Sequence, residues 1–490
     1  MNYIEKKGEM FWPTNELREN SWVKEKSIYK KANKNPIGFW EELAKEGIFW
    51  NKKWNKAYEE KLPFFKWFIG GKLNICYNAL DRHLESKGEQ DALIWVPEPT
   101  SEKTIRLSYN GLYTEVCKFA NVLKKLGVKK GEVVCIYLPL IPEVIVSMLA
   151  CARIGAIHSV VFSAFSAQAL KARIEDGKAK VLITADGYYR KGEKENLKAK
   201  ANEGIKGTKI KKTIIVKRIG NKIKLEKNES WYHELMKNSP QKCEPVSVNS
   251  ENPLFILYTS GTTGKPKGII HDTGGYAVQS LYTTKWNFNL KENDLMWCTA
   301  DIGWITGHTY LCYGPLLNGN ATLMYEGSPD YPDQGRFWRI INENKVNAFY
   351  TAPTALRIFR VWGDKFIPNK MESLNILGTV GEPIDRETWL WYFDKIGKNK
   401  LPIIDTWWQT ETGTNMINSL PGIGPFIPGT AGKSFPGTRH AVVDDKGKIL
   451  KRGKGWLVQL SPFAPAMLRG VWKNEAKYRE SYWTLNGKKT

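Results

Sequence analysis

Short apolar runs alternate with helix-length stretches along most of this chain, and that alternation limits the fold more than any other feature. In the first half, the runs Val133–Leu138, Ala156–Phe162 and Ala179–Thr184 have the length of buried strands. The segments Pro142–Ile154 and Ala167–Glu175 between them have the length of helices. Strands that are apolar throughout and separated by amphipathic helices indicate a parallel sheet covered on both faces. The sequence therefore predicts an α/β fold.

A second run of alternation, which we expect to form a second doubly wound subdomain, begins with the apolar run Leu254–Tyr258. Ligands of such sheets bind where loops leave the carboxyl ends of the strands. A basic loop, Tyr188–Lys212, and the strand Thr213–Val216 are expected to close the first half. The further expected strands of this second run are Leu295–Cys298, Ala321–Tyr325, Val346–Tyr350, Leu374–Val380 and Leu401–Asp405. Its expected helices are Gly335–Glu343, Thr354–Val361 and Asp385–Lys395, and two helices are also expected earlier in the chain, at Gly38–Glu46 and Gly111–Leu126.

From Pro421 onward the sequence changes to Gly- and Pro-rich loops with short strands, Thr438–Val443 and Trp456–Leu460. That pattern is typical of a small β-barrel. The chain has 490 residues, which is too long for one compact domain. We therefore expect an N-terminal segment, 1–85, a core of two α/β subdomains, 86–420, and a barrel, 421–490.

The composition limits the partners and the compartment. A net charge of +23 suggests nucleic acid, but the lysines are scattered and no RNA- or DNA-reading motif appears, so a lysine-rich surface is the preferred interpretation. Seven cysteines without a CxxC pair indicate a reducing compartment. The apolar window Val133–Ala152 contains two prolines and a glutamate, so it does not predict a membrane span. We expect a cytoplasmic protein that binds neither nucleic acid nor membrane.

The stretch Tyr258–Gly268, YTSGTTGKPKG, comes after a buried strand and contains a run of small and hydroxyl residues. Small residues let backbone N–H groups approach an anion, hydroxyls add donors, and Lys265 and Lys267 add positive charge. The spacing differs from a Walker A loop, because Pro266 stands where that motif has its second glycine. The stretch predicts a polyphosphate loop with a polar turn beyond it; the alternative is a solvated hairpin turn.

This loop resembles the phosphate signature of the AMP-forming acyl-adenylate family, with Thr259–Gly268 fitting the family pattern at every position. The stretch Phe64–Leu84, FFKWFIGGKLNICYNALDRHL, resembles the N-terminal segment of the acetyl-CoA synthetases within that family. The resemblance implies the large N-terminal domain of the adenylate-forming fold, with an incomplete barrel. It implies acetate–CoA ligase activity, with acetate, ATP and coenzyme A as substrates and Mg²⁺ as cofactor.

Two polar loops come after neighbouring expected strands. Gly381-Glu382-Pro383 comes after Leu374–Val380, and Thr406–Gly413, TWWQTETG, comes after Leu401–Asp405. Facing the phosphate loop, they would form a cleft, although the first loop alone could be an ordinary turn. Two adjacent tryptophans cannot both be core residues on one strand face, which favours a functional role for the second loop.

The resemblance assigns roles to these stretches. Glu411 is implied to hold Mg²⁺, which offsets the charge of the polyphosphate that lysines alone would leave. The implied catalytic residues are Lys265, Thr306, Thr410 and Glu411. The implied nucleotide-binding residues are Thr259, Ser260, Gly261, Thr262, Thr263, Gly264, Lys267, Gly381, Glu382, Pro383, Asp405, Thr406, Trp407, Trp408, Gln409 and Thr410.

The acyl pocket is implied to be small. A tryptophan across its floor, Trp408, leaves room for a methyl group, and one extra methylene changes discrimination by only about 1–3 kcal/mol, so propionate should be a poorer substrate rather than an excluded one. For His308, beside this pocket, a core histidine is the preferred interpretation and a catalytic role is the alternative. The remaining walls are Ile305, Thr306 and Val380, and the implied coenzyme A residues are Phe162, Ser163, Arg190, Lys191, Thr306, Asp330 and Ala352.

Two departures from the family pattern bear on these expectations. Glu193 stands where some relatives have a second arginine for coenzyme A, so the basic loop could instead be a solvated face. The chain also ends at Tyr482–Thr490, before the family's C-terminal domain and its catalytic lysine. Three interpretations are open: a synthetase whose C-terminal domain is supplied by a separate polypeptide, a nucleotide-binding fragment without catalysis, and a relic with an open barrel edge.

Overall fold

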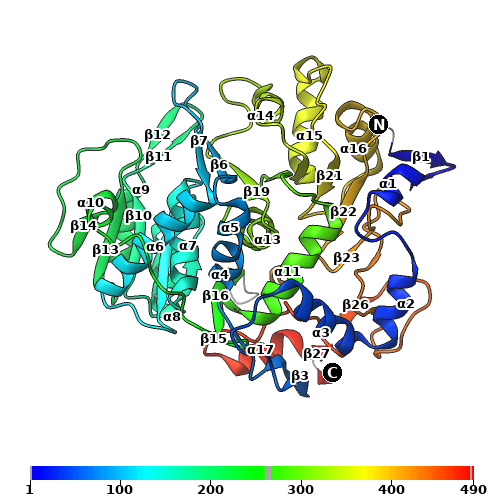
Figure 1. Ribbon diagram of the computed structural model, residues 1–490, viewed down its shortest axis with the longest axis horizontal. Helices are drawn as coiled ribbons and strands as arrows, with labels where there is room; N and C mark the ends of the chain where they lie inside the picture. The colour runs from blue at the N-terminus through cyan, green and yellow to red at the C-terminus, as the bar shows by residue number, and fades with distance from the viewer. Residues whose placement is uncertain (1–2, 260–265, 486–487, 490) are drawn as a thin grey trace.

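Two mixed sheets form the centre of the protein. The computed structural model describes residues 3–259, 266–485 and 488–489. Its seven-stranded sheet has the strand order β14-β13-β10-β8-β9-β16-β17 and lies on the left in Figure 1. The strands are β8 Val133–Tyr137, β9 Ile157–Val160, β10 Val181–Ala185, β13 Lys212–Val216, β14 Glu229–Trp231, β16 Pro253–Thr259 and β17 Lys267–Asp272.

Helices between these strands pack against the sheet. Helix α7 begins at a proline, and ten of its twelve residues are buried, as expected for a helix inside the subdomain rather than on its surface. Helix α6 begins after Ser108, whose hydroxyl accepts from the backbone N–H of Gly111. The helices are α6 Tyr109–Lys125, α7 Pro142–Arg153, α8 Ala167–Gly177, α9 Leu197–Ile205 and α10 Tyr232–Lys237.

The second sheet has nine strands in the order β24-β23-β22-β21-β20-β18-β19-β6-β7. Its central strands are parallel, and β7, β23 and β24 are added antiparallel at the edges. The strands are β6 Asp91–Val96, β7 Ile105–Ser108, β18 Leu295–Cys298, β19 Ala321–Tyr325, β20 Ala348–Thr351, β21 Ile376–Thr379, β22 Ile403–Trp407, β23 Ile417–Asn418 and β24 Lys433–Ser434. The helices around it are α11 Gly274–Asn287, α12 Ile305–Gly307, α13 Gly314–Leu317, α14 Arg336–Asn344, α15 Pro353–Trp362 and α16 Arg386–Trp391.

The N-terminal residues form short helices and strands, among them the hairpin β3–β4. Trp40 and Trp67 of this segment are fully buried, and the indole N–H of Trp67 donates to the carbonyl of Phe463. The hairpin β3–β4 therefore packs against the C-terminal part of the chain. The elements are β1 Ile4–Lys7, β2 Met10–Pro13, α1 Asn15–Glu19, α2 Ser27–Lys34, α3 Pro36–Gly47, β3 Lys56–Lys61, β4 Phe64–Ile69, β5 Lys72–Leu73, α4 Ile75–Ala79 and α5 Leu84–Lys87.

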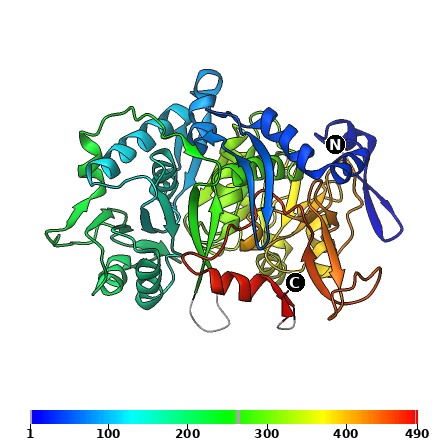
Figure 2. The same ribbon diagram turned by 90° about the horizontal axis from the view of Figure 1, so that it is seen from below.

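The last part of the chain forms a ribbon and a helix. The ribbon consists of β25 His440–Val443 and β26 Trp456–Gln459, paired antiparallel. Within the described ranges these strands form an open pair and no closed barrel. The chain then runs along β17, where the N–H groups of Arg469 and Trp472 donate to strand carbonyls, and continues into α17, Glu475–Tyr482. Figure 2 shows α17 and the ribbon at the same end of the molecule.

Three sequence-based expectations are wrong in detail. The run Leu254–Tyr258 belongs to the first sheet, since β16 pairs with β9, and its apolar character could not show which sheet it joins. Beyond the phosphate loop the chain forms strand β17 and the buried helix α11, not a polar turn. The basic loop Tyr188–Lys212 contains the hairpin β11 Tyr188–Arg190 and β12 Glu193–Glu195 and also helix α9.

Candidate active site

The stretches expected to bind nucleotide come from both sheets, and the described contact between them is the one from His271 of β17 to the carbonyl of Thr410. Thr259 ends β16 and Lys267 begins β17 in the first sheet, whereas Gly381 comes after β21 and Thr406 lies in β22 of the second. Both loops of the second sheet leave the carboxyl ends of parallel strands, as expected for a ligand site. Part of the expected phosphate loop, Ser260, Gly261, Thr262, Thr263, Gly264 and Lys265, lies outside the described residues.

Asp405 lies within β22, at the last residue that pairs with β21, in a polar but buried position. Its carboxylate accepts a 2.8 Å hydrogen bond from the hydroxyl of Thr379. Burial raises the pKa of Asp405 to about 6, although this hydrogen bond and one from the backbone of Thr406 oppose the rise. A buried acceptor at the mouth of a parallel sheet is suited to binding a hydroxyl or amino group of a ligand.

Tyr350 of β20, which is separated from β22 by β21, connects two residues of the tryptophan loop. Its hydroxyl lies 2.6 Å from the hydroxyl of Thr406 and accepts a 3.3 Å hydrogen bond from the indole N–H of Trp408. The ring of Trp408 also packs edge-on against Tyr310, with 5.2 Å between centroids. Trp408 is therefore oriented by two buried aromatic residues that the sequence analysis did not single out.

The adjacent tryptophan points elsewhere. Trp407 contacts the ring of His440 in β25, with 6.2 Å between centroids, and its backbone pairs with β23. The expectation that the two tryptophans do not share one buried face is therefore confirmed. Gln409 is exposed, and its backbone N–H is capped by the hydroxyl of Thr412 in the adjoining short turn.

The loop Gly381-Glu382-Pro383 is partly committed to contacts within the protein. Gly381 has φ of +98°, a conformation that side chains with a Cβ rarely adopt, so glycine is needed there. The carboxylate of Glu382 accepts from the hydroxyl of Thr354 and pairs with Arg357 at 2.8 Å, both in α15. These contacts hold the loop against the start of α15.

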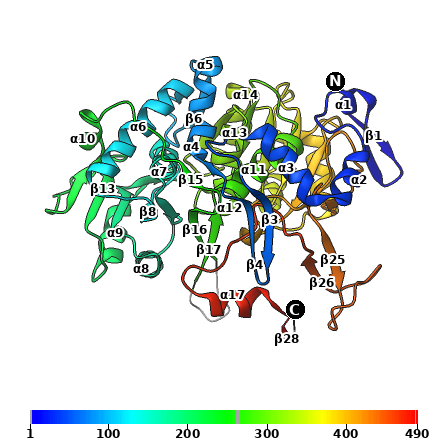
Figure 3. The ribbon, with the colours of Figure 1, turned by 60° about the horizontal axis from the view of Figure 1, so that its bottom comes forward.

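Glu411 and Lys267 both contact Tyr482, at the end of the C-terminal helix α17. The hydroxyl of Tyr482, the last residue of α17, donates a 2.6 Å hydrogen bond to the carboxylate of Glu411. The ammonium group of Lys267 lies 4.8 Å from the centroid of the same ring. Figure 3 shows α17 beside the lower ends of β16 and β17. Three groups from distant parts of the sequence thus converge beside the expected phosphate loop.

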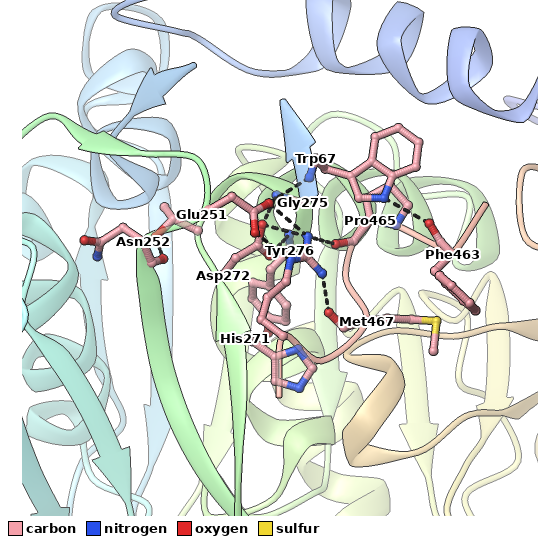
Figure 4. A network of polar contacts seen from close by, with 12 residues as sticks. Trp67, Glu251, Asn252, His271, Asp272, Gly275, Tyr276, Phe463, Pro465 and Met467 are labelled. Carbon is pink, nitrogen blue, oxygen red and sulfur yellow. Dashed lines mark hydrogen bonds and ion pairs between the residues drawn. The ribbon is translucent and has the colours of Figure 1, made fainter. Parts of the chain in front are cut away.

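A buried ion network supports this side of the site (Figure 4). Arg469 pairs with Glu251 at 3.0 Å and with Asp272 at 2.9 Å, and it donates to the carbonyls of Pro465 and Met467. Burial raises the pKa of Asp272 to about 7, opposed mainly by the positive charge of Arg469. The network attaches the chain after β26 to the start of α11.

A cavity of about 470 Å³ opens between the two sheets and collects most of the expected coenzyme A residues. Phe162, Ser163, Arg190 and Ala352 line it, and so does Val380 from the expected acyl pocket. Its other walls include the apolar Trp297, Leu311 and Phe337 and the carboxylates of Asp301 and Glu326, and its one arginine, Arg190, is exposed. Such a cavity can accept an extended ligand with an anionic end.

The remaining expected residues lie near this cavity but do not line it. Lys191 and Asp330 form an ion pair of 2.7 Å, so each neutralises the other. Ile305 is buried at the start of α12, and the carbonyl of Thr306 accepts a weak contact from the thiol of Cys298, which does line the cavity. His308 is fully buried, and burial lowers its pKa to about 4, which fits the core interpretation.

Comparisons with known proteins place this geometry in a family. Residues 80–468 match the family described as AMP-binding enzyme, and residues 25–79 match the acetyl-coenzyme A synthetase N-terminus. The chain is 46% identical to an acetyl-coenzyme A synthetase of Gemmatimonas aurantiaca, over 97% of this chain and 73% of the relative. Relatives of the same description from Methanothrix soehngenii and Rubrobacter xylanophilus are 45% and 47% identical over 97% of the chain and 73% and 74% of their own lengths. The chain belongs to the acetyl-CoA synthetase family.

A solved structure agrees on the fold. The acetoacetyl-CoA synthetase from Streptomyces lividans superposes with a TM-score of 0.89 at 22% identity, covering 99% of this chain and 76% of that one. The expected α/β architecture is therefore confirmed. The resemblance to the acetyl-CoA synthetases is confirmed by the family match and the curated relatives. In the described residues no helix is both long and apolar enough to cross a membrane.

The sequence analysis missed several residues that organise the site. Tyr350 and His271 lie within β20 and β17, and no local pattern distinguishes them from other buried strand residues. Arg469 and Tyr482 lie in the C-terminal segment, and only the three-dimensional path of the chain along β17 brings them to the site. No sequence spacing links residues that are more than 70 positions apart.

Proposed function

We propose that the chain is an AMP-forming acetate–CoA ligase, which joins acetate to coenzyme A at the expense of ATP. The observation that carries this proposal is 45–47% identity to acetyl-coenzyme A synthetases over 97% of the chain. The contacts that join Lys267 and His271 of β17 to Glu411 and Thr410 of the tryptophan loop, the first through Tyr482, support it. The proposed substrates are ATP, acetate and coenzyme A.

The first step is adenylation. Acetate is ionised at neutral pH, so it needs no general base; its oxygen attacks the α-phosphorus of ATP, and pyrophosphate leaves to give acetyl-AMP. The protein contributes position and positive charge, with Lys267 and Thr259 flanking the phosphate loop. Asp405, Thr406 and Trp407 face the nucleoside together with Gly381, Glu382 and Pro383, and Gln409 and Thr410 lie toward the α-phosphate. Lys265 and the rest of the loop complete the proposed set.

Glu411 is the proposed ligand of Mg²⁺. Magnesium bound with nucleotides commonly uses one or two protein carboxylates plus phosphate oxygens, so a single half-buried carboxylate beside the phosphate loop fits. When bound, the ion would reduce the negative charge that opposes an incoming carboxylate. Tyr482 already donates to this carboxylate and holds its orientation.

The proposed acyl pocket is enclosed by Ile305, Thr306, Val380 and Trp408. The hydrogen bond from Trp408 to Tyr350 and the ring contact with Tyr310 fix the indole. These contacts support a rigid pocket floor that admits acetate and disfavours longer acids. Preference for acetate over propionate belongs to the proposal and rests on the effect of one methylene in an apolar pocket.

The second step is thioester formation. The thiolate of coenzyme A attacks the carbonyl carbon of acetyl-AMP, and AMP leaves with the bonding electron pair, which yields acetyl-CoA. The cavity lined by Phe162, Ser163 and Ala352 leads from the surface toward Val380, and the exposed Arg190 suits an anionic phosphate. Lys191 and Asp330 would contribute only if ligand binding separates their ion pair.

The division into 1–85, 86–420 and 421–490 and a cytoplasmic location are retained as proposals. The strands β6 and β7 join the second sheet, which supports a boundary before them rather than after. The comparisons give no support to a separate polypeptide as partner, and it forms no part of the proposal.

The test is acetate-dependent exchange between ATP and pyrophosphate by the purified 490-residue chain with Mg²⁺, with propionate and no acid as parallel samples. Exchange that requires acetate is the expected result. A non-hydrolysable acetyl-adenylate analogue should also raise the melting temperature, because ligand binding to the folded state alone stabilises it. Absence of both exchange and stabilisation would overturn the proposal.

A further inference from the structure

A second cavity, of about 270 Å³, lies where the N-terminal segment meets helix α11. It shares no lining residue with the cavity between the sheets. Arg82, Lys87, Lys285 and Lys291 all line it, together with the indole of Trp22. In Figure 1 the elements around it, α5 and α11, are seen above α3. A concentration of four cations in one cavity outside the site described above calls for a separate account.

Three of these cations form no ion pair with a carboxylate among the described residues, although the more distant Glu46 and Asp294 attract Lys285 and Lys291 respectively. Arg82 donates to the carbonyl of Gly47 at 2.6 Å and to the amide oxygen of Asn78 at 3.2 Å, both neutral acceptors. Lys285 and Lys291 have no carboxylate within ion-pair distance in the described part of the chain. Burial lowers the pKa of each of these three groups. Half-buried charges without a counter-ion are costly, and the cost is normally met by pairing.

Trp22 holds the two lysines close together. Their ammonium groups lie 3.8 and 4.4 Å from the centroid of the Trp22 ring, and hence within about 8 Å of each other. The indole N–H donates a 2.7 Å hydrogen bond to the carbonyl of Leu290, which fixes the ring. Cation–π contact offsets part of the burial of each lysine but none of their mutual repulsion.

The acids of this cavity do not neutralise it. Glu292 pairs with Lys87 at 3.7 Å, with its side chain 71% exposed, and Glu46 is exposed at the edge. The net charge of the cavity is therefore positive, with the cations deeper than the acids. A multivalent oxyanion would provide the negatively charged partner that the described residues do not supply to these cations.

We propose that this cavity binds a small oligophosphate anion, with Lys285, Lys291 and Arg82 as its ligands. Pyrophosphate has the size and charge to bridge two ammonium groups and a guanidinium. The same chemistry is present in the phosphate chain of a nucleoside diphosphate, so the source is distinguished by titration with each. This site is independent of the proposed ligase reaction.

The test reads Trp22 directly, because pyrophosphate would also enter the proposed active site. The full chain is labelled with 5-fluorotryptophan, and the Trp22 resonance is assigned as the one missing from Trp22→Phe. Titration with pyrophosphate should shift this ¹⁹F resonance saturably below about 10 mM. ADP is titrated separately; a lower midpoint for ADP identifies the nucleotide as the source, and a lower midpoint for pyrophosphate identifies the free anion.

Two double variants give the matched comparison. Lys285→Gln with Lys291→Gln removes two of the three cations that lack an ion pair and should raise the midpoint at least about tenfold. Lys206→Gln with Lys209→Gln removes two exposed charges from the α9 region and should leave it unchanged. Thermal melting of both variants confirms that they are folded. A Trp22 resonance that does not move, or that moves with the same midpoint in the first variant, would overturn the proposal.

Discussion

The Nε2 atom of His271 lies 2.8 Å from the carbonyl oxygen of Thr410, and Nδ1 of the same ring lies 2.8 Å from the carbonyl oxygen of Ala466. Burial lowers the pKa of His271 to about 4, so the ring is neutral at pH 7 and carries one N–H. It therefore donates to one of these carbonyls at a time. The ring connects the expected catalytic loop with the segment that comes after the ribbon.

We predict that His271→Phe slows acetate-dependent exchange per folded molecule by on the order of tenfold to a hundredfold, because the Thr410 backbone loses its anchor near the α-phosphate. The unfolding free energy should fall by about 1–3 kcal/mol, because the one carbonyl that accepts from the ring loses its donor. The aromatic replacement keeps the packing against Phe255 and Tyr276. A purely structural role would lower the melting temperature while leaving turnover per folded molecule unchanged. His233→Phe, at an exposed position, is the control.

The contact between Tyr482 and Glu411 predicts an effect on magnesium dependence. The hydroxyl of Tyr482 occupies one carboxylate oxygen at 2.6 Å, so it competes with a cation for that oxygen. Tyr482→Phe should lower the Mg²⁺ concentration for half-maximal exchange by about two- to tenfold. Tyr29→Phe, remote from the loop, should leave the half-maximal concentration as it is. An increased magnesium requirement in Tyr482→Phe would show that the tyrosine assists binding instead.

The sequence predicted where the strands lie better than it predicted which strands are neighbours in a sheet. β18 and β19 have the expected bounds, and the loops after β21 and β22 lie where parallel strands place them. Apolar content, however, is the same for any buried strand, so Leu254–Tyr258 could not be assigned to its sheet. The run Asp91–Val96 was missed because it joins β19, more than 200 residues later in the chain.

The same distinction holds for the site. Residues within one motif, such as Thr406 and Trp408, could be identified from their spacing and their family resemblance. Partners such as Tyr350, His271 and Tyr482 could not, because their contacts depend on packing between elements that are distant in sequence. Contact across such distances is set by how the sheets and the C-terminal segment pack, which a local pattern does not encode.

The Arg469–Asp272 pair gives a prediction on stability and pH. Removing the arginine as Arg469→Met leaves Asp272 fully buried without its cation, which should cost about 3–5 kcal/mol at pH 8. The pKa of Asp272 is already raised to about 7 and rises further without Arg469. The folded variant therefore takes up a proton where the unfolded chain does not. Its unfolding free energy, relative to the native protein, should recover as pH falls from 8 toward 5.

Denaturant unfolding across this pH range checks that prediction. Asp272→Asn combined with Arg469→Met removes the titrating carboxylate, so the recovery at low pH should disappear in the double variant. Arg339→Met breaks an exposed pair with Asp333 and should change stability by less than about 1 kcal/mol at every pH. A pH-independent loss in Arg469→Met would contradict the assignment to Asp272.

Trp408 tests the proposed acyl pocket. Its indole is fixed by Tyr350 and Tyr310, so Trp408→Gly should leave space at the floor of the proposed pocket instead of letting a neighbour refill it at once. We expect the ratio of exchange rates with hexanoate and acetate to rise by about tenfold or more, because each methylene accommodated in an apolar pocket contributes about 1–3 kcal/mol. Trp407→Gly should not show this change, since Trp407 faces His440. If Trp408→Gly kept its preference for acetate unchanged, the acyl group would bind elsewhere and Trp408 would not form the floor of its pocket.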